Sequence, residues 1–459
     1  MRSGKAGVEP FLADPALPGL VIAGDPDAMR DVFQRHLRSF GRPHRLRYCR
    51  LFRVRYRRAD RCVLQYTLGL VEPDTGRERS EWVTGVMHAG DRTRRIWDKL
   101  QSADLGTIPD AVATLEPFSF VPDLGMLVQA FPYDRRLPTL PLLMSGPPPE
   151  LEPSLLARFG RGDWQTEAWN VEPVRYRAGL GATLRLTTRA RNAATGEARD
   201  GRFYVKIYRD EEEGEQTHRT LRAFGDEVDG EGFGVGRPIV YSGDLRALLQ
   251  EEAPGVSLQE ILQNRDGSVP ARQAAAALAA LHLGRAPTTR RHRSQDEVAA
   301  IARTGNLLRW ACPHLEERVS AAVGAVTADL GEAPTGPTHR DLKPEHILLN
   351  GDRPYLLDLD WFAEADPLLD SAGLLAGLAS MPMRFDVPRE RPLKAARAFA
   401  GEYFARVPRA WRDRLPVHYA GAVLKEAVGS FRRQEPGWSD KIAVLVREAE
   451  DSLAGELPW

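Results

Sequence analysis

The most informative segment of the chain lies at residues 338–349 and reads Thr338-His339-Arg340-Asp341-Leu342-Lys343-Pro344-Glu345-His346-Ile347-Leu348-Leu349. The spacing of its polar residues is typical of a loop that transfers phosphoryl groups. A carboxylate at Asp341 can take the proton of an acceptor hydroxyl, and Lys343 can hold the transferring group. His346 follows Asp341 at the spacing of a metal ligand. The segment therefore predicts Asp341 and Lys343 as catalytic residues.

A second acidic motif follows a short turn at residues 350–352. The chain then reads Tyr355-Leu356-Leu357-Asp358-Leu359-Asp360, an apolar strand with acidic residues at its end. A strand of this kind presents Asp358 as the acid that binds a metal ion. On a continuing strand Asp360 points the same way and can share the metal, although a structural or substrate-facing role fits it equally well. Together the two motifs predict a metal-dependent phosphotransfer site.

The two motifs resemble those of the kinase superfamily. Residues 339–346 read HRDLKPEH, which differs from the HRDLKPEN loop of eukaryotic protein kinases only at His346. Residues 361–374 instead resemble the aminoglycoside phosphotransferase and choline kinase branch, in which a helix comes directly after the metal-binding strand. No Ala-Pro-Glu element closes an activation segment. The resemblance favours a small-molecule kinase over a protein kinase.

The resemblance also implies cofactors and roles. ATP and Mg²⁺ are the expected cofactors, with Asp358 and His346 as the metal-binding residues. Asp366 and Asp370 are expected to hydrogen-bond to the catalytic loop. The family usually has Asn at the position of His346, so an imidazole nitrogen replaces a hard oxygen ligand. His346 then binds the metal directly, holds it through water, or leaves one metal site empty. We expect activity to be retained, because the magnesium ion bound by Asp358 does not depend on this residue.

The composition excludes several functions. The chain of 459 residues has 63 basic and 63 acidic side chains, so no global charge attracts nucleic acid or a membrane surface. Only seven of the basic residues are lysines, a bias typical of GC-rich bacterial genomes, so a lysine at a motif position carries weight. No signal peptide opens the chain, and no segment approaches the roughly 20 apolar residues of a membrane span. We expect a bacterial, cytoplasmic protein without nucleic-acid or membrane partners.

The amino-terminal half contains an internal repeat. Residues 54–57 (Val-Arg-Tyr-Arg) recur at 174–177, and the Thr75-Gly76 pair recurs at 195–196, both displaced by 120 residues. Asp, Leu and Gln positions within residues 123–129 recur at a displacement of 121. A nearly constant offset indicates a duplicated unit. The alternation of apolar residues predicts strands at 62–71 and 82–87 in the first copy and at 183–190 and 203–208 in the second.

The second copy alone carries a lysine for a nucleotide. The strand at residues 202–208 presents Lys206, where kinases hold the α- and β-phosphates of ATP. The acid-rich helix start that follows offers Glu215 as its ion-pair partner, with Glu213 as a close rival. The equivalent strand of the first copy, residues 82–88, has no lysine. The first copy is therefore predicted to be degenerate.

Two further segments of the second copy are predicted to contact the nucleotide. Gly179 and Gly181 lie between its first two strands, where glycine lets backbone amides approach phosphates. An ordinary hairpin turn explains the two glycines about equally well. Glu251, Glu252 and Ala253 resemble the hinge whose backbone pairs with adenine, with a surface strand ending in a Pro-Gly turn as the competing interpretation.

These observations predict an α+β fold. It is a bilobal, protein-kinase-like fold with an antiparallel sheet lobe and a mainly helical carboxy-terminal lobe, preceded by a degenerate duplicate of the sheet lobe. Helices are predicted at residues 257–262, 269–282, 295–330 and 369–451. The predicted parts are a degenerate repeat at 1–145, a linker at 146–165, the sheet lobe at 166–253 and the helical lobe at 254–459.

The leading functional hypothesis is an ATP-dependent kinase. Its partner is a small-molecule hydroxyl acceptor, such as a sugar, an aminoglycoside-type antibiotic or another metabolite. A catalytically silent, kinase-like binding module is the alternative from a different class, and a protein kinase is the third. The first repeat is expected to pack, to regulate, or to mediate self-association.

Overall fold

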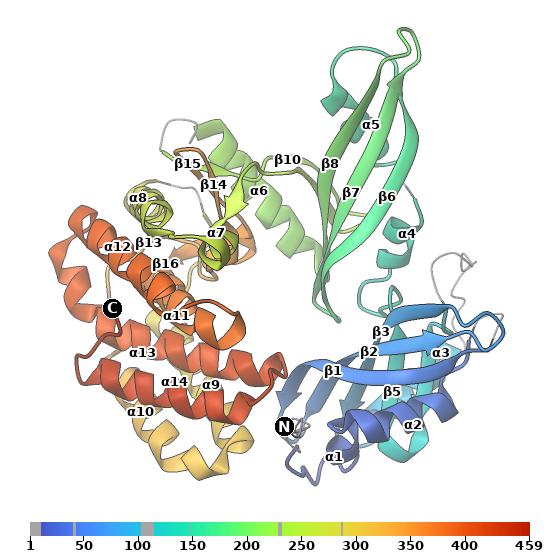
Figure 1. Ribbon diagram of the computed structural model, residues 1–459, viewed down its shortest axis with the longest axis horizontal. Coiled ribbons are helices and arrows are strands. Elements are labelled where there is room, and N and C mark those ends of the chain that lie inside the picture. The colour runs from blue at the N-terminus through green and yellow to red at the C-terminus, as the bar shows by residue number, and fades with distance from the viewer. Residues whose placement is uncertain (1–10, 40–42, 102–113, 147, 228–231, 286–287) are drawn as a thin grey trace. The chain divides into compact units, whose positions relative to one another are not determined.

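A computed structural model describes the chain except for residues 1–10, 40–42, 102–113, 147, 228–231 and 286–287 (Figure 1). The described residues form two compact units. The first comprises Met1–Glu211, Ser242–Leu249 and Phe431–Trp438, and the second comprises Glu212–Tyr241, Gln250–Ser430 and Ser439–Trp459. Both sheets and helices are extensive, which confirms the predicted α+β class.

The first sheet of the first unit has five strands in the order β1-β2-β3-β5-β4. Its strands are β1 (Arg45–Arg57), β2 (Arg61–Val71), β3 (Glu78–His88), β4 (Phe118–Val121) and β5 (Met126–Ala130). The helices that accompany it are α1 (Leu20–Ala23), α2 (Pro26–His36) and α3 (Arg92–Gln101). β2 is buried along almost its whole length between β1 and β3, as its apolar sequence requires.

The second sheet has the order β6-β7-β8-β11-β10, so its strands follow the same first, second, third, fifth, fourth pattern as those of the first sheet. The strands are β6 (Trp164–Arg177), β7 (Gly181–Asn192), β8 (Ala198–Tyr208), β10 (Pro238–Ser242) and β11 (Ala247–Glu251). The short helices α4 (Leu140–Ser145) and α5 (Glu152–Leu156) precede it. In each case a helix follows the third strand: α3 follows β3, and α6 (Glu211–Glu227) follows β8.

The same hydrogen-bonded corner occurs beside both sheets. Asp14 accepts hydrogen bonds from the hydroxyl of Tyr56 (2.7 Å) and the amide of Ala59 (2.9 Å). At a displacement of 120 residues, Asp134 accepts from the hydroxyl of Tyr176 (2.9 Å) and the amide of Gly179 (2.5 Å). The turn residues Ala59 and Gly179 both have positive φ angles, of 53° and 64°. Each carboxylate thus fixes the turn between the first two strands of its sheet.

The second unit is mainly helical. Its helices after α6 are α7 (Leu258–Asn264), α8 (Ser268–Leu283), α9 (Ser294–Ala311), α10 (Glu316–Asp329), α11 (Leu368–Arg384), α12 (Glu390–Arg406), α13 (Arg409–Arg432) and α14 (Trp438–Leu453). The alanines of α8 are largely buried, and the helix packs against α12. Small side chains on one helix allow such close packing of a second.

Two small sheets lie among these helices. One has the order β12-β14-β15-β9 and the other pairs β13 with β16. Their strands are β9 (Gly234–Val235), β12 (Val256–Ser257), β13 (Gly336–Thr338), β14 (Ile347–Asn350), β15 (Arg353–Leu356) and β16 (Ala363–Ala365).

Most of the predicted elements are confirmed. The four strands predicted from the repeat lie within β2, β3, β7 and β8, and the predicted helices correspond to α7, α8, α9 with α10, and α11 to α14. One prediction was wrong: the strand through Tyr355 ends at Leu356, and Asp358 has a φ of 64° before a 3-10 turn over Leu359–Trp361. Asp358 and Asp360 therefore do not share one face of a strand.

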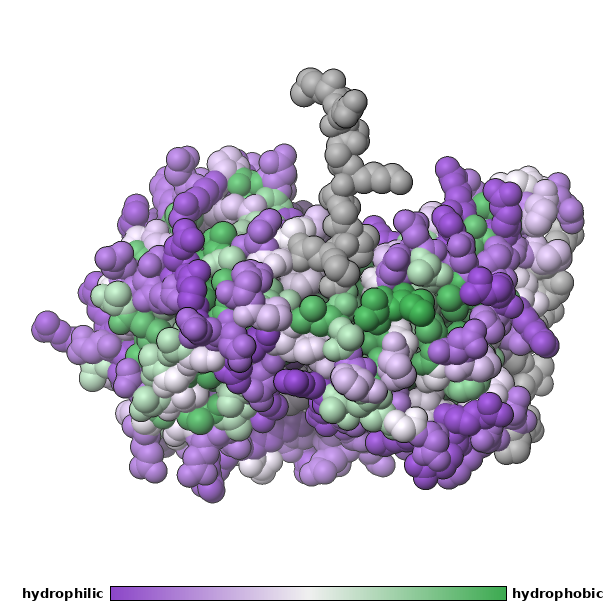
Figure 2. Space-filling view, turned by 90° about the horizontal axis from the view of Figure 1, so that it is seen from below, coloured by the Kyte–Doolittle hydropathy of each residue, from purple (hydrophilic) through white to green (hydrophobic). Residues whose placement is uncertain are grey.

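The segment predicted as a linker is ordered where the structure describes it. Residues 146–165 include α5, a 3-10 turn at Ala157–Phe159 and the start of β6. The compact units group residues up to Glu211 together, so the predicted boundaries at 145, 165 and 253 stay predictions. Hydrophilic side chains cover most of the face in Figure 2, with hydrophobic residues in patches between them. No helix of the described residues is long and apolar enough to cross a membrane.

Candidate active site

Residues 339–346, which we call the catalytic loop, lie between two pairs of short strands in the second unit. β13 leads into it and pairs antiparallel with β16, while β14 leads out of it and pairs antiparallel with β15. The amide of Leu357 donates to the carbonyl of His346 at 2.8 Å, which extends the second pairing by one residue. Because of this pairing, the end of the loop and the residues after β15 lie side by side.

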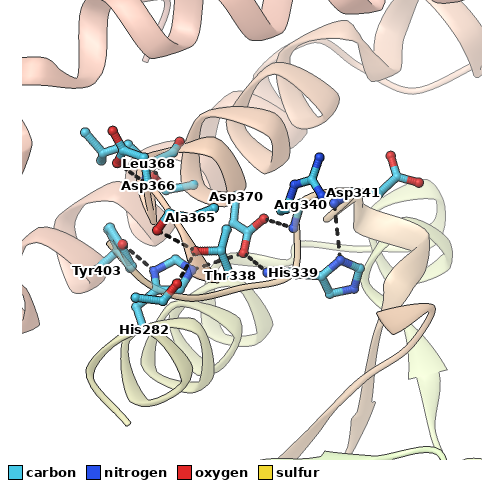
Figure 3. A network of polar contacts seen from close by, with 12 residues as sticks. His282, Thr338, His339, Arg340, Asp341, Ala365, Asp366, Leu368, Asp370 and Tyr403 are labelled. Atoms are coloured by element: carbon cyan, nitrogen blue, oxygen red, sulfur yellow. Dashed lines mark hydrogen bonds and ion pairs between the residues drawn. The ribbon is translucent and has the colours of Figure 1, made fainter. Parts of the chain in front are cut away.

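Asp370 on α11 fixes the start of the loop (Figure 3). Its carboxylate accepts from the backbone amides of His339 and Arg340, both at 2.6 Å. Arg340 has a φ of 70°, a left-handed conformation that costs about 1 kcal/mol or more in a non-glycine residue. The two hydrogen bonds to a fully buried carboxylate offset this strain. The expected bond between Asp370 and the loop is confirmed.

Two buried side chains in turn support Asp370. His282 Nε2 lies 3.1 Å from Asp370 Oδ2, and His282 Nδ1 lies 2.7 Å from the hydroxyl of Tyr403 (Figure 3). Asp366, by contrast, does not bond to the loop: it accepts from the amide of Leu368 at 3.1 Å and pairs with Arg414 and His418 on α13. The expectation for Asp366 was wrong, because its carboxylate turns to its own helix start and to α13.

Asp341 and Lys343 form an ion pair. Lys343 Nζ lies 2.7 Å and 2.8 Å from the two carboxylate oxygens of Asp341. Burial alone would raise the pKa of Asp341, but Lys343 and His346 outweigh it and lower the pKa. The side chain of Asp341 keeps 30% of its surface exposed, so a second molecule can reach an ionised carboxylate.

His339 orients this part of the loop. It is fully buried, and its Nε2 lies 2.7 Å from the carbonyl of Leu357, to which it donates. Its Nδ1 then accepts from the amide of Asp341 at 3.3 Å. The sequence motif contains His339, but we had assigned it no role. Its neighbour Arg340 approaches His292 Nδ1 at 2.8 Å, and nothing in the sequence indicated that partner.

His346 and Asp358 join Asp341 in one cluster. Ligand atoms of the three side chains all lie within 4.8 Å of one another. The Nδ1 of His346 lies 2.8 Å from the carbonyl of Asp341, and Nε2 lies 3.5 Å from Asp358 Oδ2. A carbonyl only accepts, so Nδ1 carries the proton and Nε2 presents its lone pair. Among the described residues no other group of three such side chains is gathered this closely.

The cluster fits a divalent metal ion. Burial is the largest cause that lowers the pKa of His346, to about 4, so the imidazole is neutral at ordinary pH. Two carboxylates and one neutral imidazole nitrogen suit magnesium or manganese and also accept softer metals. The structure therefore brings Asp341, His346 and Asp358 together and sets Lys343 beside them, as the motif spacing predicted.

The predicted phosphate-binding residues lie in the first unit. Lys206 is half-buried on β8, opposite Thr183 of β7. A Cβ atom at Gly181 would lie 2.8 Å from the carbonyl of Ile207, so this position requires glycine. The amide of Gly179 already donates to Asp134 and is not available to a phosphate. The turn geometry thus accounts for Gly179, as the competing hairpin interpretation proposed.

Helix α6 holds the candidate partners of Lys206. Glu215 is exposed and lies 4.0 Å from Arg219, one helical turn further on. Glu213 is half-buried, and its carbonyl accepts from the hydroxyl of Thr217 at 2.9 Å. Neither exposure nor these contacts identifies the partner of Lys206, so Glu215 stays the prediction, with Glu213 as its rival.

The predicted hinge borders a cavity. The amide of Glu251 donates to the carbonyl of Arg237 at 2.9 Å, so this amide is not available to a base. Glu251, Glu252 and Ala253 line a cavity of about 240 Å³ together with aromatic residues that include Phe233 and Tyr355. All lining residues belong to the second unit, so the cavity does not include the strands that carry Lys206.

Comparisons with known proteins agree with this chemistry. The profile of the phosphotransferase enzyme family matches residues 184–414, half of the chain, and this range contains Lys206 and the whole metal cluster. No curated protein matches the sequence.

Several solved structures match over most of their own length. A choline kinase from Streptococcus pneumoniae is 15% identical with a TM-score of 0.43, and the match covers 67% of this chain and 99% of that one. A macrolide 2'-phosphotransferase from Brachybacterium faecium is 16% identical with a TM-score of 0.39, covering 64% and 96%. An aminoglycoside phosphotransferase from Streptomyces rimosus is 19% identical with a TM-score of 0.37, covering 60% and 97%.

The family match and the geometry of the catalytic loop lead to the same conclusion. The chain belongs to the phosphotransferase enzyme family.

Proposed function

We propose that this protein is an ATP-dependent, magnesium-dependent kinase that transfers the γ-phosphate to a hydroxyl group of a small molecule. The observation that carries the proposal is the cluster of Asp341, His346 and Asp358, with ligand atoms within 4.8 Å, in a chain of this family. Phosphoryl transfer asks a protein mainly to position two oxygens and to neutralise charge. The residues of the cluster can both position the oxygens and, with a bound metal ion, neutralise the charge.

The residues of the second unit divide the work as follows. Asp341 accepts or orients the proton of the acceptor hydroxyl, since it is ionised and partly exposed. Lys343 keeps that carboxylate deprotonated and offers a cation to the transferring group. Asp358 and His346 would hold the metal ion, which supplies positive charge to the phosphates when bound. Asp370 acts through the backbone and is a positioning residue.

Strand β8 and helix α6 supply the proposed nucleotide-binding residues: β8 carries Lys206, and α6 carries Glu213 and Glu215. Lys206 holds the α- and β-phosphates of ATP, and Glu213 or Glu215 orients the side chain of Lys206. Gly181 has no side chain, so the backbone of β7 can approach the phosphates closely. The first sheet is taken as a degenerate duplicate of this lobe, which the shared strand order and the paired Asp14 and Asp134 corners support. The protein is proposed to act in a bacterial cytoplasm, with the first sheet serving regulation or self-association.

The test is ATP consumption against a panel of hydroxyl acceptors. The panel contains choline, an aminoglycoside, a macrolide and simple sugars, with Asp341→Asn as the control protein. Acceptor-dependent ADP formation by the parent, with a phosphorylated product found by mass spectrometry, is the expected result. ATP binding without transfer to any acceptor, at any divalent metal, would overturn the proposal.

A second candidate is a silent nucleotide-binding module. His346 at the usual Asn position and the occupied amide of Gly179 favour it. This candidate predicts equal ATP affinity and zero turnover for the parent and for Asp341→Asn. The same panel therefore separates the two functions.

A further inference from the structure

The first unit contains a second cluster of charged groups, which shares no residue with the catalytic loop. A cavity of about 30 Å³ is lined by Arg55, Arg61, His88, Arg135 and Arg136, and by the turn residues Ala178 and Gly179. We name the four arginine side chains the arginine cluster; burial lowers the pKa of His88 to about 4, so this imidazole is neutral at ordinary pH. The cavity has room for about one or two water-sized groups.

The arginine cluster lacks balancing acids. Among the described residues that line the cavity only Asp134 is acidic. Its oxygens already accept from Tyr176, Gly179 and the amide of Arg136, at 2.9, 2.5 and 2.8 Å. In the described part of the chain, no carboxylate forms an ion pair with the guanidinium group of Arg61, Arg135 or Arg136. Positive charge therefore accumulates around a small, partly enclosed space.

Lowered pKa values of several arginines reflect the electrostatic cost of this arrangement. Burial lowers the pKa of Arg55 to about 10, and the charges of Arg61 and Arg177 add to the effect. Burial likewise lowers the pKa of Arg61 and of Arg135, with neighbouring arginines contributing. Half-buried like charges without partners destabilise a fold unless an anion or a counter-charge joins them. Guanidinium groups bind phosphate oxygens through planar pairs of N–H donors, so the chemistry of the cluster suits an oxyanion.

The position of the cluster within the first sheet is informative. At the displacement of 120 residues, Val86 corresponds to Lys206 and Arg61 corresponds to Gly181. The corner that carries a lysine and a glycine in the second sheet therefore carries a valine and an arginine in the first. Both Val86 and Arg61 line the cavity. The small volume leaves no space for a nucleoside, which limits a ligand to a compact anion.

We propose that the arginine cluster binds inorganic phosphate, or the terminal phosphate of a small metabolite, and that the bound anion stabilises the turn at residues 178–181. The turn is already in contact with the cluster. Arg55 donates to the carbonyl of Ala178, and Arg136 packs so close to Gly179 that an added Cβ atom would lie 3.1 Å from its Cδ. An anion that orders these guanidinium groups therefore also orders the turn that begins β7, the strand opposite Lys206.

The experiment is calorimetric titration of the full chain with inorganic phosphate at constant ionic strength. The test variant is Arg61→Gln with Arg135→Gln, and the matched control is Arg50→Gln, an exposed arginine of β1 that does not line the cavity. Lys206→Ala separates this site from a nucleotide site. We expect the parent, Arg50→Gln and Lys206→Ala to bind phosphate alike, and the double variant to bind roughly tenfold more weakly or worse. Glycerol phosphate tests whether a terminal phosphate replaces the free ion.

Two further measurements keep the test decisive. Hydrogen exchange of the amides of residues 178–181 slows on addition of phosphate in the parent and in Lys206→Ala, but not in the double variant. Without phosphate, the double variant melts at the same or a higher temperature than the parent, because repulsion is relieved. Equal phosphate binding by the double variant, loss of binding in Lys206→Ala, or no binding by the parent at millimolar phosphate would overturn the proposal.

Discussion

The two five-stranded sheets have the same strand order and differ in their chemistry. In both, an aspartate ties a tyrosine hydroxyl to the turn between the first two strands. Only the second sheet presents a lysine on its third strand, where the first has Val86. The two sheets thus have the same strand order and the same corner contacts, while the residues at equivalent strand positions differ.

The largest effect is expected at the catalytic loop. Asp341→Asn removes the ionised carboxylate but preserves the shape of the side chain. Turnover should fall by about 10² to 10⁴-fold, because a positioned base is lost, while ATP affinity stays within about twofold. Steady-state kinetics and nucleotide titration check this. Unchanged turnover would mean that the loop is not the catalytic centre and that the difference between the sheets lies elsewhere.

The next largest effect is expected at Lys206, whose equivalent in the first sheet is Val86. Lys206→Ala should weaken ATP binding by about tenfold or more, since a charge-assisted contact to the phosphates is lost. Val86→Ala should leave ATP affinity unchanged. Nucleotide titration of both variants measures the contrast. Equal weakening by the two substitutions would show that the two sheets are not divided into a binding and a non-binding copy.

A smaller effect is expected at the paired corners. Asp14→Ala and Asp134→Ala each leave a tyrosine hydroxyl and a backbone amide without an acceptor, so each should lower the free energy of unfolding by about 1–3 kcal/mol. Urea denaturation measures both losses. Nucleotide titration distinguishes them, because only Asp134 holds the turn next to β7. If Asp14→Ala weakened ATP binding as much as Asp134→Ala, the functional division would be wrong.

The smallest effect is a pH dependence at the first corner. Burial alone would raise the pKa of Asp14, but hydrogen bonds from Tyr56, Ala59 and Ala16 outweigh it and lower the pKa from its ordinary value of 3.8. The unfolded chain thus binds the proton more readily, so the stabilisation is complete above the unfolded value and is lost as the pH falls through the lower folded value. The stability difference between the parent and Asp14→Asn should be constant above pH 5 and shrink below pH 4. A difference that grew on acidification would contradict this sign.

The catalytic loop was predictable because its chemistry is local in the chain. Asp341, Lys343 and His346 lie within a few residues, and Asp358 follows a single hairpin later, so short strands bring them together. The supports of the loop were less predictable. His282 on α8 meets Asp370 on α11 and Tyr403 on α12, two helices that lie far from α8 in the sequence. Only the expectation for Asp370 anticipated any of this network.

Two features could not be read from the sequence pattern. The strand before Asp358 was expected to continue, but Asp358 turns into the left-handed region, which separates it from Asp360. At Gly179 the sequence left a phosphate cradle and an ordinary hairpin turn both open, and the amide donates to Asp134, which lies 45 residues earlier in the chain. At Asp358 a local turn ends the strand, and at Gly179 a hydrogen bond to a distant residue occupies the amide. Sequence periodicity indicates neither feature.

From the sequence alone, the order of motifs, the repeat offset and the side chains predicted to be catalytic followed, because each depends on residue type and short-range spacing. The tertiary structure decided which nitrogen of His346 faces Asp358, which amides remain available, and where unbalanced arginines gather. Those properties depend on hydrogen bonds and burial between residues distant in the chain, and only folding brings such partners within reach of one another.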